Sequence, residues 1–192
     1  MEAADAVELR VLGTLIEKQR TTPDAYPLSL NSLRLACNQT SSRDPIVDYD
    51  EPAIRTALER LSRKGWVRLA SGPGSRAAKY RHLFGEAMGL DDAELALLAV
   101  LMLRGPQTVG ELKQRTERLH RFETLDETEQ TLAALIGSEL VEELPRRRFA
   151  HTLGGGARVE PAAAPSLEER VRRLEEDVAS LREELEASRI GD

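Results

Sequence analysis

The feature that most constrains the fold is an internal repeat. Apolar residues at helical spacing between Val7 and Ile16 recur 86 residues later, between Ala93 and Met102. A helix-to-strand pattern over residues 54–67 recurs, at most of its positions, 74 residues later. A repeat of about 75–85 residues with its own apolar set has the size of a small domain. The sequence therefore predicts two tandem domains, residues 1–85 and 86–153.

Each repeat is expected to contain three helices followed by a short β-hairpin. In the first repeat, the extended runs 66–70 and 76–84 flank the turn-forming segment Ser-Gly-Pro-Gly-Ser. Three helices with such a hairpin are the pattern of a winged helix. About ten polar residues separate Gln39 from Asp50, more than the short turn of a simple helix-turn-helix allows. We therefore expect a mainly α fold with small β-hairpins, built as two tandem winged-helix domains plus a C-terminal coiled-coil helix.

The last part of the chain differs in pattern from the two repeats. Residues 154–165, rich in Gly, Ala and Pro, are expected to form a flexible linker, and residues 166–190 a coiled-coil helix. Its apolar residues alternate steps of four and three, and β-branched a positions with leucine at d favour parallel dimers. A solvated single helix, or one folded back on its own domain, is the alternative. The expected dimerisation seam consists of Leu167, Val171, Leu174, Val178, Leu181 and Leu185.

Composition excludes several classes of protein. The chain is 41% hydrophobic and 31% charged, a composition typical of folded, soluble proteins. Its longest apolar run, Leu95 to Leu103, is far shorter than the roughly 20 residues of a membrane-spanning helix. The first residues lack the basic start and apolar core of a secretory signal. The single cysteine, Cys37, forms neither an internal disulfide nor a thiolate cluster. We expect a cytoplasmic protein that has no membrane segment.

No residue pattern indicates catalysis. The three histidines, His82, His120 and His151, are scattered and lack metal-binding spacing. No serine, cysteine or carboxylate pair stands in a recognisable catalytic setting. Residues 72–77 match a dinucleotide-binding motif, but a strand-like run follows them where that motif requires a helix. The sequence therefore predicts a protein that is not an enzyme, with no cofactor and no metal site.

Charge is distributed unevenly along the chain, whose net charge is −6. Residues 1–84 carry 13 Lys/Arg against 10 Asp/Glu, whereas residues 85–160 carry 9 against 14. In a winged helix the third helix enters the DNA major groove and the hairpin reaches the backbone, so cations on both neutralise phosphates. A solvated basic face without a ligand is the alternative. The candidate nucleic-acid-binding residues are Arg55, Arg60, Arg63, Lys64, Arg76, Lys79 and Arg81, and Arg68 lies on the same hairpin.

A long motif over residues 26–45, YPLSLNSLRLACNQTSSRDP, resembles the YceH family of bacterial proteins. The resemblance extends through LGTLIEKQRTTPDAYPLSLN before the motif and GSRAAKYRH after it, and covers residues 7 to about 153. It implies two tandem winged-helix domains and no established biochemical activity. The motif positions carried over are Tyr26, Pro27, Leu28, Ser29, Asn31, Ser32, Leu33, Cys37, Asn38, Gln39, Ser42, Arg43 and Pro45.

Several polar residues of this motif have no evident place in a core. A long polar loop in a compact domain is more often functional or mobile, which makes these residues candidates for contact with a ligand. The alternative is a network of side-chain-to-backbone hydrogen bonds that shapes the loop, and both interpretations stay open at this point. The motif candidates are Asn31, Ser32, Asn38, Gln39 and Arg43.

These observations favour a non-enzymatic homodimer that binds double-stranded DNA through its first domain and acts in transcription. The third helix of the second repeat lies in the stretch from Asp126 to Glu143, which has no Lys or Arg. The second domain is therefore expected to pack, dimerise or contact a protein. The alternative function is a protein–protein interaction adaptor or scaffold with no nucleic-acid role, which the acidic total charge favours.

Overall fold

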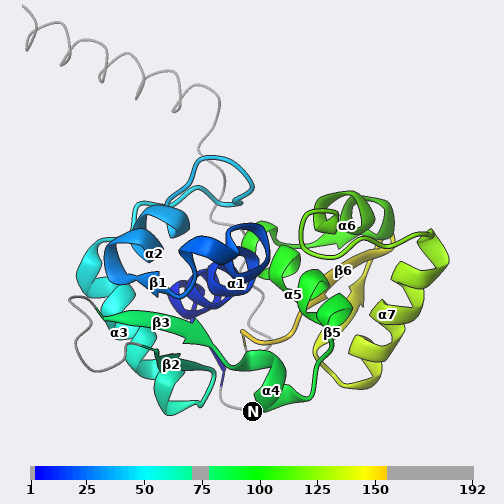
Figure 1. The fold of residues 1–192 in the computed structure, drawn as a ribbon. Helices are drawn as coiled ribbons and strands as arrows, with labels where there is room; N and C mark the ends of the chain where they lie inside the picture. Colours follow the sequence, from blue (N-terminus) through cyan, green and yellow to red (C-terminus); the bar gives the residue numbers. More distant parts are fainter. Residues whose placement is uncertain (1–2, 71–77, 155–192) are drawn as a thin grey trace, which may run out of the picture. The chain divides into compact units, whose positions relative to one another are not determined.

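The computed structural model describes residues 3–70 and 78–154 of the 192-residue chain (Figure 1). Three sequence-based predictions lie outside the described residues: the linker, the dimerisation seam in residues 166–190, and the position of Arg76. Within the described ranges, no helix is long and apolar enough to cross a membrane.

Apart from one short 3-10 helix in the first repeat, the described part of the chain forms the same series of elements twice. The first series is α1 (Ala6–Thr21), the short 3-10 helix η1 (Pro23–Ala25), β1 (Leu28–Ser29), α2 (Leu30–Cys37), α3 (Glu51–Arg63), β2 (Val67–Leu69) and β3 (Lys79–His82). The short helix α4 (Phe84–Met88) connects it to the second. The second series is α5 (Asp92–Arg104), β4 (Gln107–Thr108), α6 (Val109–Thr116), α7 (Leu125–Gly137), β5 (Val141–Leu144) and β6 (Arg148–His151).

Two small antiparallel sheets complete the repeats. Their strand orders are β1-β3-β2 and β4-β6-β5, so the last strand of each hairpin lies in the middle. Val67 pairs with His82 in one sheet, and Val141 pairs with His151 in the other, so the two registers correspond. A mainly helical fold with small sheets is confirmed. The two-residue strands β1 and β4 are additional, since so short a segment carries no alternating pattern.

Matching caps begin the first helix of each repeat. Asp5 caps α1 and Asp91 caps α5, each accepting a hydrogen bond from the backbone of a glutamate three residues later. The glutamates, Glu8 and Glu94, bond back to the backbone of the cap, which completes a capping box in both helices. These local hydrogen bonds explain why the repeat begins at corresponding residues 86 positions apart.

The core joins the two repeats. Helices α1 and α5 pack against each other, and Figure 1 shows them side by side at the centre of the described part. A Cβ atom at Gly13 would lie 3.1 Å from Leu103 and from Met102, so the missing side chain lets the helices approach closely. All nine residues from Leu95 to Leu103 are buried, which accounts for the apolar run in the sequence. One hydrophobic cluster therefore serves both repeats.

Candidate nucleic-acid interface

Helix α3 turns a polar face to solvent. Its first turn begins at Asp50, whose side chain accepts a hydrogen bond from the backbone of Ala53. The side chains of Arg55, Arg60 and Arg63 are exposed. The apolar residues of the opposite face, Ile54, Ala57, Leu58 and Leu61, are buried.

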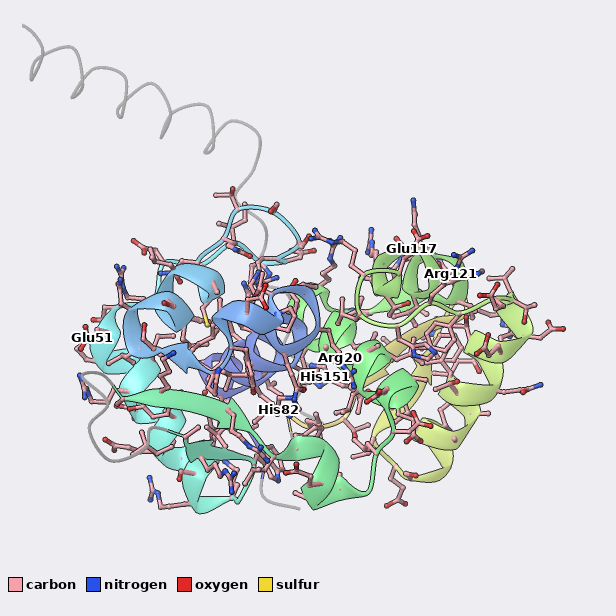
Figure 2. The ribbon with its side chains drawn as sticks, viewed as in Figure 1. Arg20, Glu51, His82, Glu117, Arg121 and His151 are labelled. Atoms are coloured by element: carbon pink, nitrogen blue, oxygen red, sulfur yellow. The ribbon has the colours of Figure 1, made fainter. Side chains whose placement is uncertain are left out.

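Two of these arginines pair with carboxylates at the surface. Arg55 bonds to Glu51 at 2.6 Å, and Arg60 bonds to Asp5 at 2.6 Å. Figure 2 shows Glu51 at the outer edge of α3. All four side chains are about half-exposed, and such pairs stabilise a protein by only about 0–1 kcal/mol. A phosphate can therefore replace either carboxylate at small cost.

Lys64 lies inside the protein. Its side chain is 7% exposed, and its ammonium group bonds at 2.6 Å to Glu8, which is 3% exposed. The pair joins the end of α3 to the first turn of α1, so the charge is neutralised within the first repeat. This geometry differs from the surface position that the charge pattern indicated for Lys64. We therefore leave Lys64 out of the candidate interface.

The hairpin β2–β3 carries a cluster of cations on one face. Lys79 and Arg81 alternate along β3 with Tyr80 and His82, and Arg68 of β2 pairs directly with Arg81, whose side chain is 30% exposed. Like charges directly opposite each other destabilise a sheet. Glu86 bonds to Arg81 at 2.9 Å, while Arg68 and Lys79 have no carboxylate partner within the described ranges. An anion on this face would relieve the repulsion.

The corresponding face of the second repeat keeps only one of these cations, Arg148 of β6, which pairs with Thr108 as Lys79 pairs with Ser29. In α7 the exposed positions that match the arginines of α3 carry Glu129, Ala134 and Gly137. In β5 the position that matches Arg68 carries Glu142. In the turn after β5, Arg147 pairs with Glu129 at 3.2 Å. The difference in charge between the two repeats of the sequence is therefore also a difference in charge between two corresponding surfaces.

The polar residues of the 26–45 motif bond within the chain. Asn38 donates to the carbonyl of Tyr49 at 2.9 Å and to Asp48 at 3.2 Å, and accepts from the Tyr49 N–H at 2.9 Å. This side chain therefore ties together both ends of the loop between α2 and α3. Three other polar residues of the motif also bond within the chain: Ser32 bonds to Ser29, Asn31 accepts from Arg34, and Gln39 accepts from Lys18.

Arg43 fixes the middle of the same loop. Its side chain is fully buried and forms two hydrogen bonds with Glu17 of α1, at 3.1 and 2.6 Å. It also donates to the carbonyl of Ala36 at 3.0 Å. Burial raises the pKa of Glu17, but the hydrogen bonds and charge of Arg43 outweigh burial and hold that pKa below its usual value. This geometry favours the interpretation that the motif shapes the loop.

We predict that Asn38→Ala lowers the free energy of unfolding by about 1–3 kcal/mol, because the backbone groups of Tyr49 lose their partners. Urea denaturation measures the change. Asn31→Ala is the matched control, since the exposed Asn31 makes one long bond of 3.4 Å. Equal losses in the two variants would contradict a bridging role for Asn38.

Two histidines occupy corresponding positions at the ends of β3 and β6, where His82 is buried and His151 is partly buried (Figure 2). Nε2 of His82 lies 2.5 Å from Oε1 of Gln19. Nδ1 of both His82 and His151 is buried without a hydrogen-bond partner among the described residues. Burial lowers the pKa of each histidine to about 4. Within residues 3–70 and 78–154, no group of three His, Cys, Asp or Glu side chains could hold a metal ion.

Comparison with known proteins gives one family match and a set of relatives. A family model described as "Protein of unknown function, DUF480" matches residues 4–149. A UPF0502 protein of Opitutus terrae is 50% identical over 188 residues, covering 92% of this chain and 82% of the relative. A UPF0502 protein of Solibacter usitatus is 46% identical over 198 residues and 96% of each chain. The similarity therefore includes both repeats.

Proposed function

The chain belongs to the DUF480 family of proteins of unknown function, and from this premise we propose that its first repeat is a winged helix that binds double-stranded DNA. The element order α1, β1, α2, α3, β2, β3 and the strand order β1-β3-β2 support a winged helix. The second repeat has the same order, which supports a tandem pair. We also infer that the family is the one named YceH, which the motif over residues 26–45 resembles.

The observation that carries this proposal is a set of cations on α3 and on the β2–β3 hairpin that follows it. We define the cationic surface by six residues: Arg55, Arg60 and Arg63 of α3, Arg68 of β2, and Lys79 and Arg81 of β3. A helix is about 10–12 Å wide, and the DNA major groove, about 12 Å wide, admits it. With α3 in the groove, the hairpin cations reach the phosphate backbone, where contacts position a protein without reading sequence.

The same proposal assigns roles to the second repeat and to residues 166–190. The second repeat is a poor phosphate binder, since its matching surface carries Glu129 and Glu142 in place of cations. One DNA-binding repeat per chain and a dimer formed through residues 166–190 would present two cationic surfaces to a duplex. We propose that this protein has no catalytic activity, binds no cofactor and lies in the cytoplasm.

The test measures binding of the full chain to a fluorescent duplex at several salt concentrations. We expect the triple variant Arg63→Ala/Arg68→Ala/Lys79→Ala to bind roughly a hundredfold more weakly than the wild type at about 0.1 M salt. The slope of log K against log salt should fall by about 1 for each cation that contacts a phosphate. Fluorescence anisotropy gives both quantities.

A matched control removes three exposed cations from the second repeat: Arg118→Ala/Arg121→Ala/Arg146→Ala. It changes the net charge equally but leaves the cationic surface intact, so it should keep nearly wild-type affinity and slope. If both triple variants lose the same affinity, the duplex binds to positive charge anywhere on the protein rather than to the cationic surface. Binding that is weak and indifferent to salt would overturn the proposal and favour the adaptor or scaffold function.

A further inference from the structure

The exposed side of α3 has a centre and two flanks. The buried residues Ile54, Ala57, Leu58 and Leu61 define the inner side of the helix. Since successive residues of an α-helix turn by about 100°, Glu59 and Arg63 lie within about 30° of the line opposite that inner side. Arg55 and Arg60 lie about 70° to either side of the line. Beside the neutral Thr56, the centre therefore carries one carboxylate and one guanidinium, with an arginine on each flank.

These positions have different surroundings in a DNA groove. The flanks of a bound helix face the two phosphate walls, which suits Arg55 and Arg60, whereas the central line faces the edges of the bases. Glu59 is exposed and has no cation within 4.0 Å in the described part of the chain. A carboxylate there repels phosphates, so it weakens binding to every duplex unless a base donates a hydrogen bond to it.

The base that meets this requirement is cytosine. A carboxylate only accepts hydrogen bonds, and the cytosine N4 amino group is the major-groove donor that Glu and Asp side chains pair with. Arg63 lies four residues further along α3, a rise of about 6 Å, or roughly two base-pair steps of 3.4 Å. A guanidinium at the base edges pairs with O6 and N7 of guanine.

We infer, resting on the proposed DNA binding, that α3 makes the binding sequence-specific through Glu59 and Arg63. Glu59 accepts a hydrogen bond from N4 of a cytosine. Arg63 donates two hydrogen bonds to O6 and N7 of a guanine roughly two base pairs away. The partner is therefore a duplex with a defined C·G and G·C spacing rather than any double-stranded DNA.

The experiment selects bound duplexes from a pool with a randomised centre, using the full chain. Wild-type protein should enrich a C·G pair and, roughly two positions away, a G·C pair. Replacing either pair should weaken binding by about 5- to 150-fold. Glu59→Gln should replace the cytosine preference by adenine, because a glutamine amide pairs with N6 and N7 of adenine. The guanine preference should be unchanged in that variant.

The matched control is Glu142→Gln, which removes the same charge from an exposed position in β5 and should keep the wild-type sequence preference. If wild-type protein enriches no duplex and shows no salt-dependent binding, the DNA-binding function itself fails. If binding is salt-dependent but no sequence is enriched, only the specificity inference is overturned. The same holds if Glu59→Gln retains the cytosine preference.

Discussion

Arg43→Met is expected to lower the free energy of unfolding by about 3–5 kcal/mol, the usual cost of removing one partner of a buried ion pair. The methionine fills much of the same space, so the loss comes from the charge left on Glu17, whose side chain is only 13% exposed and keeps only the more distant Lys18, at 3.4 Å. The carbonyl of Ala36 also loses its donor. Urea denaturation followed by the fluorescence of the buried Trp66 measures the change.

Arg55→Met provides the matched control. The distance from Arg55 to Glu51 is 2.6 Å, as in the buried pair, but both side chains are more than half exposed. The free energy of unfolding should therefore fall by no more than about 1 kcal/mol in Arg55→Met. Adding Glu17→Gln to Arg43→Met should restore part of the stability, since no charge is then left buried. A loss below about 1 kcal/mol for Arg43→Met would refute the role assigned to this pair.

The second large effect is a fall in stability with acidification between pH 6.5 and pH 4. A histidine in the unfolded chain titrates near its ordinary pKa of 6.5, whereas burial lowers the pKa of His82 and of His151 to about 4. The unfolded state therefore binds more protons in this range, and the stability present above pH 6.5 is lost as the pH falls. Each histidine should contribute about 3 kcal/mol over the whole range.

Urea denaturation at pH 7, 6 and 5 measures this dependence. His82→Gln and His151→Gln should each remove about half of the slope, and the double variant should remove most of it. Because the pKa falls to about 4 at both histidines, the two single variants should show similar changes. A wild-type stability that is flat from pH 7 to pH 5 would contradict buried, neutral histidines.

Local patterns in the sequence predicted a large part of the fold. The apolar spacing of Val7 to Ile16 and of Ala93 to Met102 is set within a few turns, and both stretches form helices. The apolar residues of α3 are buried as their spacing indicates. The uneven charge of the repeats also follows from composition alone. By contrast, β1 and β4 depend on pairing with distant strands and left no local signal.

Only part of the candidate site could be predicted from the sequence. The exposed arginines of α3 follow from helical periodicity, because their positions relative to the core depend on one helix. The surroundings of Lys64 and Arg43 do not follow from helical periodicity. Their partners, Glu8 and Glu17, lie 56 and 26 residues away in the sequence. A charge pattern alone does not distinguish an exposed lysine from one that a second helix covers.

The sequence by itself determined where helices begin, which of their faces are apolar and which repeat is basic, since each depends on neighbours within a few turns. Only the tertiary structure decided which cations stay at the surface. Packing α1 against α3 brings Glu8 to Lys64 and Asp5 to Arg60. Burial and pairing of a charge depend on the three-dimensional arrangement of helices, which no single segment of the chain contains.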